Sequence, residues 1–146
     1  DQGEVFYIEM IPGSYALTIA AAVGQRLPAH CTASGKQFLA HLPAQELEIV
    51  LSRPLIAYTA KTIVSADHLR QHLTHIRQQG YALDDEEFET GIRAVACPIF
   101  DRQGRVVAAM SIPSPASRMT VARVPEIARA LSDAAKAVSR RLGWNL

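Results

Sequence analysis

The sequence predicts an α+β domain in which helices cover an antiparallel sheet. Segments rich in β-branched and aromatic residues are interspersed with segments whose apolar residues recur at helical spacing. The clearest strand pair, residues 92–100 and 105–112, is joined by the turn Asp101–Gly104, as in a β-hairpin. Because the elements do not follow the regular strand–helix–strand order of a parallel sheet, we expect antiparallel connections.

Length and composition fit one globular domain. The 146 residues are 49% hydrophobic and 20% charged, which is the balance of a chain that can bury a core. The 15 basic and 14 acidic residues give a net charge of +1, and the absence of a basic run disfavours a nucleic-acid surface. Since the sequence contains neither a signal-peptide pattern nor an apolar stretch of membrane-spanning length, we expect a cytoplasmic protein with no membrane partner.

The N-terminal segment predicts two antiparallel strands. Residues 4–10 alternate as a strand does, residues 12–14 supply turn chemistry, and residues 15–22 resume a β-capable run. Residues 27–31 show no regular pattern, so we expect irregular structure there.

Two short helices and a longer one follow. Residues 36–42 predict a helix that Pro43 stops, and residues 44–51 predict a second helix. Ser65 and Gly80 are favourable N-terminal and C-terminal capping residues for an amphipathic helix between them. The apolar face of this helix consists of Leu69, Leu73 and Ile76. Three histidines, whose spacing could bind a metal if they were buried, are expected at the edge of that face or in solvent: His68, His72 and His75.

The C-terminal half predicts the hairpin and a last helix. Residues 81–83 enter a strand that ends at the acidic run 84–87. Residues 106–112 are apolar apart from Ser111, so we expect this strand to be covered on both faces and central in its sheet. Thr120 can cap the final helix. Its apolar face is expected to contain Ile127, Leu131, Ala134, Ala135 and Val138.

Three polar features could serve a ligand. The helix start at residues 32–36 offers unpaired backbone N–H groups and a positive dipole end to an anion, although Thr32 or Ser34 could simply cap it. The acidic run 84–87 could hold a metal or a hydroxyl-bearing ligand, but its spacing favours a solvated loop. Ser111 must either bond to the backbone or face a cavity with polar contents.

The cysteines and the absence of catalytic motifs argue against an enzyme. Cys31 and Cys97 have no zinc-site spacing, so we expect free thiols. As a nucleophile Cys97 would need a base such as His30 or His41, and a buried, inert cysteine is the favoured interpretation. Because the chain lacks the common hydrolase, metalloprotease and nucleotide-binding motifs, we assign it no catalytic activity, cofactor or metal.

Two blocks of the sequence resemble one protein family. Residues 24–36 (GQRLPAHCTASGK), with FLA at 38–40, resemble the V-G-x-x-x-P-x-H-x-T-A-x-G-K-x-x-L-A signature of IclR-type bacterial transcription regulators. The second block matches at residues 80–87, 91–101, 104, 108–112, 115, 117, 118 and 120. The two blocks stand in the family's order and span most of residues 3–143.

The resemblance implies a GAF-like domain, which is a twisted antiparallel sheet with helices packed on its faces. Residues 1–146 would be the effector-binding domain, and the N-terminal winged helix-turn-helix DNA-binding domain of the family is expected to be absent from this chain. Family members are dimers or dimers of dimers, so the resemblance implies a homodimer or tetramer. Binding of a small-molecule effector would allosterically control operator DNA, which is contacted only through that missing domain.

The resemblance also implies the residues of a ligand site. Ala33 and Ser34 would offer backbone N–H groups to a carboxylate. Asp84 would accept a hydrogen bond from a hydroxyl or protonated group, and Ser111 would donate one. The apolar wall of the site would consist of Leu27, Ile19 and Ile92.

Two positions depart from the family pattern. Ala94 stands where some members have Cys, and Pro113 stands where some have Ser, so two polar contacts are missing. We therefore expect a ligand larger or more apolar than glyoxylate or pyruvate, such as an aromatic or longer-chain carboxylate. Two rival hypotheses stay open: a stand-alone GAF-like module for signalling or oligomerisation, and a thiol hydrolase that uses Cys97.

Overall fold

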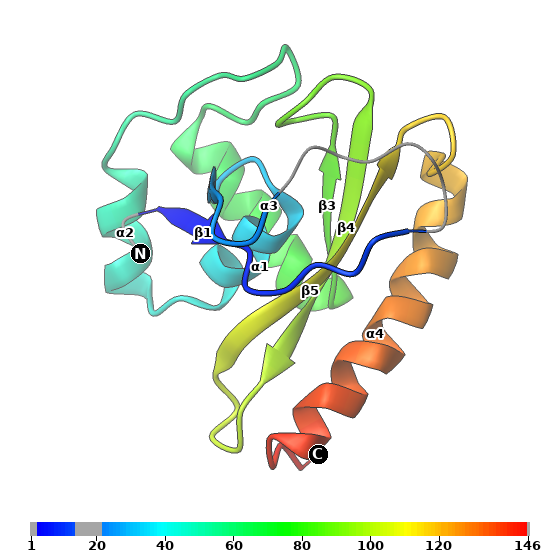
Figure 1. Ribbon diagram of the computed structural model, residues 1–146. Coiled ribbons are helices and arrows are strands. Elements are labelled where there is room, and N and C mark those ends of the chain that lie inside the picture. Colours follow the sequence, from blue (N-terminus) through cyan, green and yellow to red (C-terminus); the bar gives the residue numbers. More distant parts are fainter. Residues whose placement is uncertain (1–2, 14–21, 146) are drawn as a thin grey trace.

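The α+β fold class is confirmed by the computed structural model, which describes residues 3–13 and 22–145 (Figure 1). The main sheet is antiparallel, and its strands lie in the order β3 (Ala82–Asp85), β4 (Ile92–Phe100) and β5 (Val106–Pro115). A two-stranded antiparallel sheet, which we call the ribbon, consists of β1 (Glu4–Phe6) and β2 (Arg26–Pro28).

Helices cover both faces of the main sheet (Figure 1). They are α1 (Ala33–His41), α2 (Ala44–Leu51), α3 (Ala66–Gln79) and α4 (Val124–Arg141), with the 3-10 helix η1 (Val121–Arg123) before α4. The long helix α4 packs on one face, and α1 packs on the other with α3 against it. No helix in the described ranges combines the length and apolar character needed to cross a membrane.

Each face of the main sheet has its own core because side chains alternate along β4. Val95, Cys97 and Ile99 belong to the cluster that α4 covers. A separate cluster fills the space between α1, α3 and the start of β3. Its members include Leu39, Leu69, Leu73, Ile76 and Ala82.

The predicted helices are confirmed with small shifts at their ends, but the predicted cap Thr120 precedes η1 and makes no capping hydrogen bond through its side chain. α2 has the predicted bounds. α3 begins after Ser65, whose hydroxyl accepts a hydrogen bond from the amide of His68 at 3.4 Å. It ends at Gly80, which adopts the left-handed φ of 82° that favours glycine at a helix C-terminus. α1 begins at Ala33, three residues before the predicted start.

The N-terminal strands differ from the prediction. β1 covers residues 4–6 of the predicted 4–10, and it pairs with residues 26–28, which overlap the segment expected to be irregular. A strand of three residues is too short to show an alternating pattern, and a proline such as Pro28 usually marks a turn or loop. Most of the predicted strand 15–22 lies outside the described residues.

The hairpin is confirmed, but the prediction that its second strand is covered on both faces is wrong. Among the described strands, β4 pairs on both sides and β5 pairs with β4 alone, and the central position of β5 stays a prediction. Val107 and Ile112 of β5 are 48% and 39% exposed. An apolar run predicts a strand, but it does not show which elements cover the two faces of that strand. On α4, similarly, Ala134 is exposed and Ala128 is the buried residue.

The N-terminus of α1 packs tightly against the preceding turn. Thr32 caps the helix, because its hydroxyl accepts a hydrogen bond from the amide of Gly35 at 3.3 Å and donates one to the carbonyl of Pro28 at 2.7 Å. A Cβ atom added to Gly35 would lie 2.3 Å from the Cα of Ala29 and 2.4 Å from its carbonyl oxygen. The helix therefore approaches the turn this closely only because residue 35 is glycine.

We predict that Gly35→Ala lowers the free energy of unfolding by about 2–3 kcal/mol, because the new methyl group collides with backbone atoms. In an unhindered helix the same change stabilises by up to about 1 kcal/mol, so the sign of the effect tests the contact. Urea denaturation measures it. Gly13→Ala is the control, since its Cβ would meet nothing within 4 Å. A neutral or stabilising Gly35→Ala variant would contradict the packing described.

Candidate functional site

The register of the main sheet brings four of the predicted site residues onto one face. Asp84, Ala94 and Pro113 are neighbours in one row across β3, β4 and β5. Ser111 lies in the adjacent row, opposite Ala96. Because the intervening residues of β4 lie under α4, these side chains lie on the face against which α1 packs.

The N-terminus of α1 supplies the predicted backbone donors. The hydroxyl of Thr32 accepts a hydrogen bond from the amide of Gly35, so the prediction that Thr32 caps the helix is confirmed for this one amide. Within the described part of the chain, no acceptor is hydrogen-bonded to the amides of Ala33 and Ser34. The first turn contains no acidic side chain. The positive end of the helix dipole is therefore available to an anion.

Asp84 is a buried carboxyl group on the same side of the sheet. It is 5% exposed, and its Oδ1 accepts a hydrogen bond from the amide of Glu87 at 2.8 Å. Burial raises the pKa of Asp84 to about 6, although the amide of Glu87 and the charge of Lys36 act in the opposite direction. A carboxyl group with a pKa raised by burial is typical of functional sites.

Lys36 is fully buried, and its ammonium group has partners on three different elements. Nζ donates to the carbonyl of Leu83 on β3 at 2.5 Å and to Nε2 of His72 on α3 at 3.2 Å. Its third partner is the carboxylate of Glu87 in the turn after β3. Burial and the charge of Lys36 lower the pKa of His72 to about 4, so the imidazole is neutral and can accept. We call these four residues the Lys36 network.

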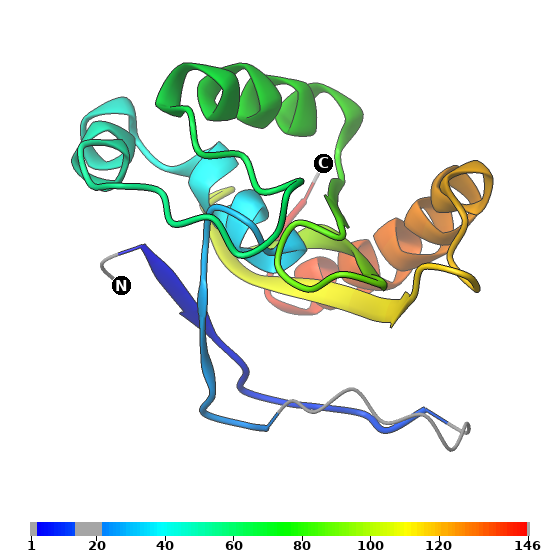
Figure 2. The ribbon, with the colours of Figure 1, turned by 90° about the horizontal axis from the view of Figure 1, so that it is seen from above.

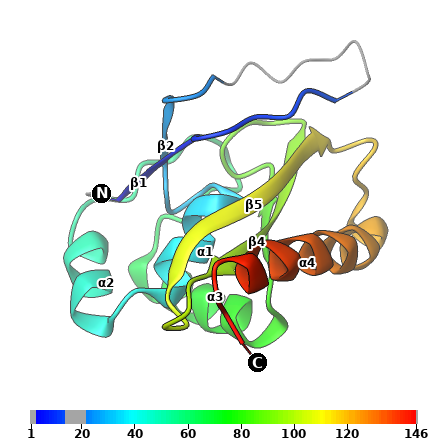
Figure 3. The ribbon, with the colours of Figure 1, turned by 60° about the horizontal axis from the view of Figure 1, so that its bottom comes forward.

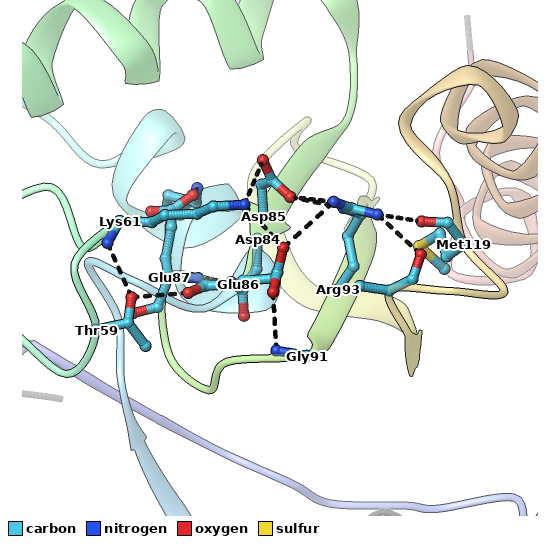
Figure 4. Close-up of polar contacts among 11 residues, drawn as sticks. Thr59, Lys61, Asp84, Asp85, Glu86, Glu87, Gly91, Arg93 and Met119 are labelled. Carbon is cyan, nitrogen blue, oxygen red and sulfur yellow. Dashed lines mark hydrogen bonds and ion pairs between the residues drawn. The ribbon is translucent and has the colours of Figure 1, made fainter.

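The acidic run 84–87 consists of the last two residues of β3 and the turn that follows, which ion pairs hold, so the prediction of a solvated loop was wrong (Figure 4). Asp85 lies 2.6 Å from the guanidinium of Arg93, and Glu86 lies 2.7 Å from the ammonium of Lys61. Glu86 also accepts a hydrogen bond from the amide of Gly91 at 2.9 Å. In the portion of the chain that the structure describes, no group of acidic, histidine and cysteine side chains is arranged to hold a metal.

Neighbouring segments fix this turn from both sides. The hydroxyl of Thr62 donates to the carbonyl of Glu87 at 2.6 Å. The buried guanidinium of Arg93 donates to the carbonyls of Met119 at 2.5 Å and Ala116 at 3.1 Å (Figure 4). One arginine thus links the acidic turn to the segment that leads into α4.

The predicted apolar wall is only partly described. Leu27 is buried on β2, Ile92 is half-buried at the start of β4, and Ile19 lies outside the described residues. A pocket of about 380 Å³ opens beside the ribbon and the end of α2, and of the predicted site residues it is lined by Leu27 alone. The part that each residue plays in binding stays a prediction.

Two features of this region escaped the sequence predictions. Lys36 was assigned only to a helix start, although it lies three residues before Leu39, the spacing of one helix face. Tyr7, on the segment after β1, lies near Asp84: burial and the charge of Asp84 both raise the pKa of its phenol. Alternation with Val5 was the signal that could have placed Tyr7 on the inner side of the strand.

The cysteines lack the surroundings of a nucleophile. Cys97 is buried under α4, and its thiol donates to the carbonyl of Ala128 at 3.7 Å. Burial raises the pKa of Cys97 to about 11 and that of Cys31 to about 12. Both groups are therefore protonated thiols at neutral pH, and the thiolate is the reactive form.

The family follows from this fold and sequence together. The family model of the C-terminal domain of the bacterial transcriptional regulator IclR matches residues 1–140. The chain therefore belongs to the IclR family of bacterial transcriptional regulators, and it corresponds to the effector-binding regulatory domain of such a regulator.

Individual relatives agree with this assignment. The regulator XynR of Escherichia coli K12 is 39% identical over 145 residues, which cover 99% of this chain and 58% of that protein. The crystal structure of IclR from Thermotoga maritima matches with a TM-score of 0.92 at 36% identity over 99% of this chain and 59% of that chain. An inducer-binding domain of PobR from Acinetobacter, a double mutant in complex with 3-hydroxybenzoic acid, matches with a TM-score of 0.85 at 28% identity over 95% of this chain and 83% of that chain. The chain thus spans little more than half the length of XynR and the Thermotoga regulator.

We predict that Lys36→Met lowers the free energy of unfolding by about 3–5 kcal/mol, because it leaves the buried carboxylate of Glu87 without its counter-charge. Adding Glu87→Gln should recover at least about 1 kcal/mol, since the side chain that remains is uncharged. Chemical denaturation measures both variants. Lys61→Met removes an exposed partner of Glu86 and serves as the control, with a much smaller expected effect. Equal losses in Lys36→Met and Lys61→Met would argue against the Lys36 network.

We also predict that Asp84→Asn stabilises the domain at neutral pH. The folded-state pKa of about 6 lies above the unfolded value of 3.8, so the native state binds more protons between these values and loses stability as the pH rises through them. Removing the charge should add roughly 1–3 kcal/mol at pH 7.5 and little at pH 4, because the asparagine oxygen can still accept from Glu87. Thermal unfolding across this pH range measures the difference. A loss of stability that is the same at every pH would refute the raised pKa.

Proposed function

We propose that this domain senses a small organic carboxylate and performs no chemistry on it. The carboxylate would bind at the N-terminus of α1 and accept hydrogen bonds from the amides of Ala33 and Ser34. Asp84 would accept a hydrogen bond from a hydroxyl or protonated group of the ligand, and Ser111 would donate one. The observation that carries the proposal is a pair of helix N-terminal amides that have no acceptor among the described residues, next to the sheet face that holds Asp84 and Ser111.

The body of the ligand would be more apolar than glyoxylate or pyruvate. Ala94 and Pro113 lie in the row of Asp84 and bring no polar side chain to it. Beside them, the proposed apolar wall consists of Leu27, Ile92 and Ile19. The complex of the PobR domain with 3-hydroxybenzoic acid supports an aromatic carboxylate as the first ligand class to test.

The proposed role in the cell is regulatory. A homodimer or tetramer would bind operator DNA in the cytoplasm through a separate winged helix-turn-helix domain, and the effector would change that affinity. This requires that the effector bind one arrangement of the regulator more tightly than the other. The regulators that this chain resembles support this role, whereas the protonated, buried thiol of Cys97 disfavours a thiol hydrolase.

We predict that aromatic carboxylates raise the melting temperature in a thermal-shift screen, since a ligand at one hundred times its dissociation constant stabilises by about 2.7 kcal/mol. Calorimetry then gives the affinity. Ala33→Pro removes the amide at the first position of α1, where proline fits the helix, and should weaken binding about tenfold or more. Ala33→Val adds comparable bulk, keeps the N–H group and serves as the control.

Two results would count against the proposal. Equal affinities of Ala33→Pro and Ala33→Val for the ligand would show that the Ala33 amide does not bind it. If no carboxylate stabilises the domain, a carboxylate is not its ligand. Selective tight binding of glyoxylate would contradict only the apolar character proposed for the ligand.

A further inference from the structure

The residue that directly follows β1 of the ribbon is a tyrosine, Tyr7, on the inner side. Val5 of β1 packs against the core between α1 and α3, and its cross-strand partner Leu27 is buried. Because side chains alternate along a strand, Tyr7 lies on the same side as Val5. The exposures agree: Tyr7 is half-buried, while Phe6 and Ile8 on either side of it are 55% and 69% exposed.

Backbone hydrogen bonds fix the position of Tyr7. Its carbonyl accepts from the amide of Gly24 at 2.7 Å, and its amide donates to the carbonyl of Gln25 at 3.3 Å. These bonds continue the antiparallel ladder beyond β1 and set the direction of the side chain. Figures 2 and 3 show the ribbon as a layer separate from the main sheet; Tyr7 directly follows the ribbon strand β1, whereas Asp84 belongs to β3 of the main sheet.

The phenol of Tyr7 has Asp84 as an electrostatic neighbour and lacks a hydrogen-bond partner in the described ranges. The negative charge of Asp84 adds to burial in raising the pKa of Tyr7. Asp84 points from β3 toward the side of α1, and its Oδ1 bonds to the amide of Glu87. The phenol on the inner side of the ribbon thus has the carboxylate of the main sheet as its charged neighbour.

We infer that Tyr7 is a specificity-determining residue which, with Asp84, selects effectors that carry a hydroxyl group. A ligand hydroxyl can donate to the carboxylate of Asp84 and also accept from the phenol of Tyr7, whereas an ammonium group only donates and a carbonyl group only accepts. A ligand without such a group leaves the phenol of Tyr7 and the second oxygen of Asp84 without a ligand partner, which weakens its binding. The inference rests on the proposed function and narrows its ligand to a hydroxy acid with an apolar body.

Calorimetry with matched pairs of acids tests this inference. The probes are benzoate against 3-hydroxybenzoate, benzoate against 4-hydroxybenzoate, and hexanoate against 6-hydroxyhexanoate. In at least one pair the wild-type domain should bind the hydroxylated acid about tenfold more tightly, and Tyr7→Phe should reduce that ratio to about twofold while the parent acid keeps its affinity. Tyr81→Phe removes a phenol hydroxyl on the α4 side of the sheet, serves as the matched control and should keep the ratio.

The outcomes separate this inference from the proposed function. No preference for the hydroxylated acid in any pair, an unchanged ratio in Tyr7→Phe, or equal changes in Tyr7→Phe and Tyr81→Phe would overturn the role of Tyr7 and leave carboxylate sensing intact. No binding of any acid by the wild-type domain would overturn both.

A measurement without ligand tests the pairing itself. Asp84→Asn should lower the pKa of the Tyr7 phenol, followed by NMR of ring-labelled tyrosine, because the neighbouring charge is lost. An unchanged pKa would overturn the pairing of Tyr7 with Asp84.

Discussion

The buried positive charge of Lys36 is the constraint on which the rest of this domain depends. An ammonium group is stable in the interior only when its donors are all satisfied and a counter-charge lies beside it. Lys36 meets both conditions with partners from α3, β3 and the acidic turn, so these segments and α1 must assemble together. The same contact fixes the N-terminus of α1 beside Asp84. The geometry of the candidate site is therefore a product of the network that orders the fold.

The network is not arranged for maximal stability. One carboxylate oxygen of Glu87 is buried and, among the described residues, has no hydrogen-bond partner. Asp84 is a carboxyl group that burial disfavours in its charged form. Such groups cost stability, and their concentration at the end of β3, on the α1 side of the sheet, supports the proposed binding role of this region, whereas the core between the sheet and α4 is largely apolar.

The parts of the fold that could be predicted from the sequence are those with local signals. Ser65 and Gly80 mark the ends of α3 by capping chemistry alone, and the glycine-containing turn marks the hairpin. The acidic turn was misassigned because its partners, Lys36 and Arg93, come from other elements and only tertiary structure brings them near. That Asp84, Ala94 and Pro113 are neighbours likewise depends on the strand register, which the spacing of residues along the sequence does not reveal. Those three residues entered the candidate site through family resemblance, and the register then placed them in one row.

The close approach of Gly35 to Ala29 restricts how a domain of this kind can diversify. A position that admits no side chain cannot be used to adjust the fit of a new ligand, and the two amides beside it are held by the same backbone contact. Strand positions 94 and 113 are less restricted, since Ala94 is only half-buried and Pro113 is exposed. Substitutions on the sheet can thus alter which molecule the proposed site recognises, while the close approach of Gly35 to Ala29 constrains the backbone that we propose binds the carboxylate.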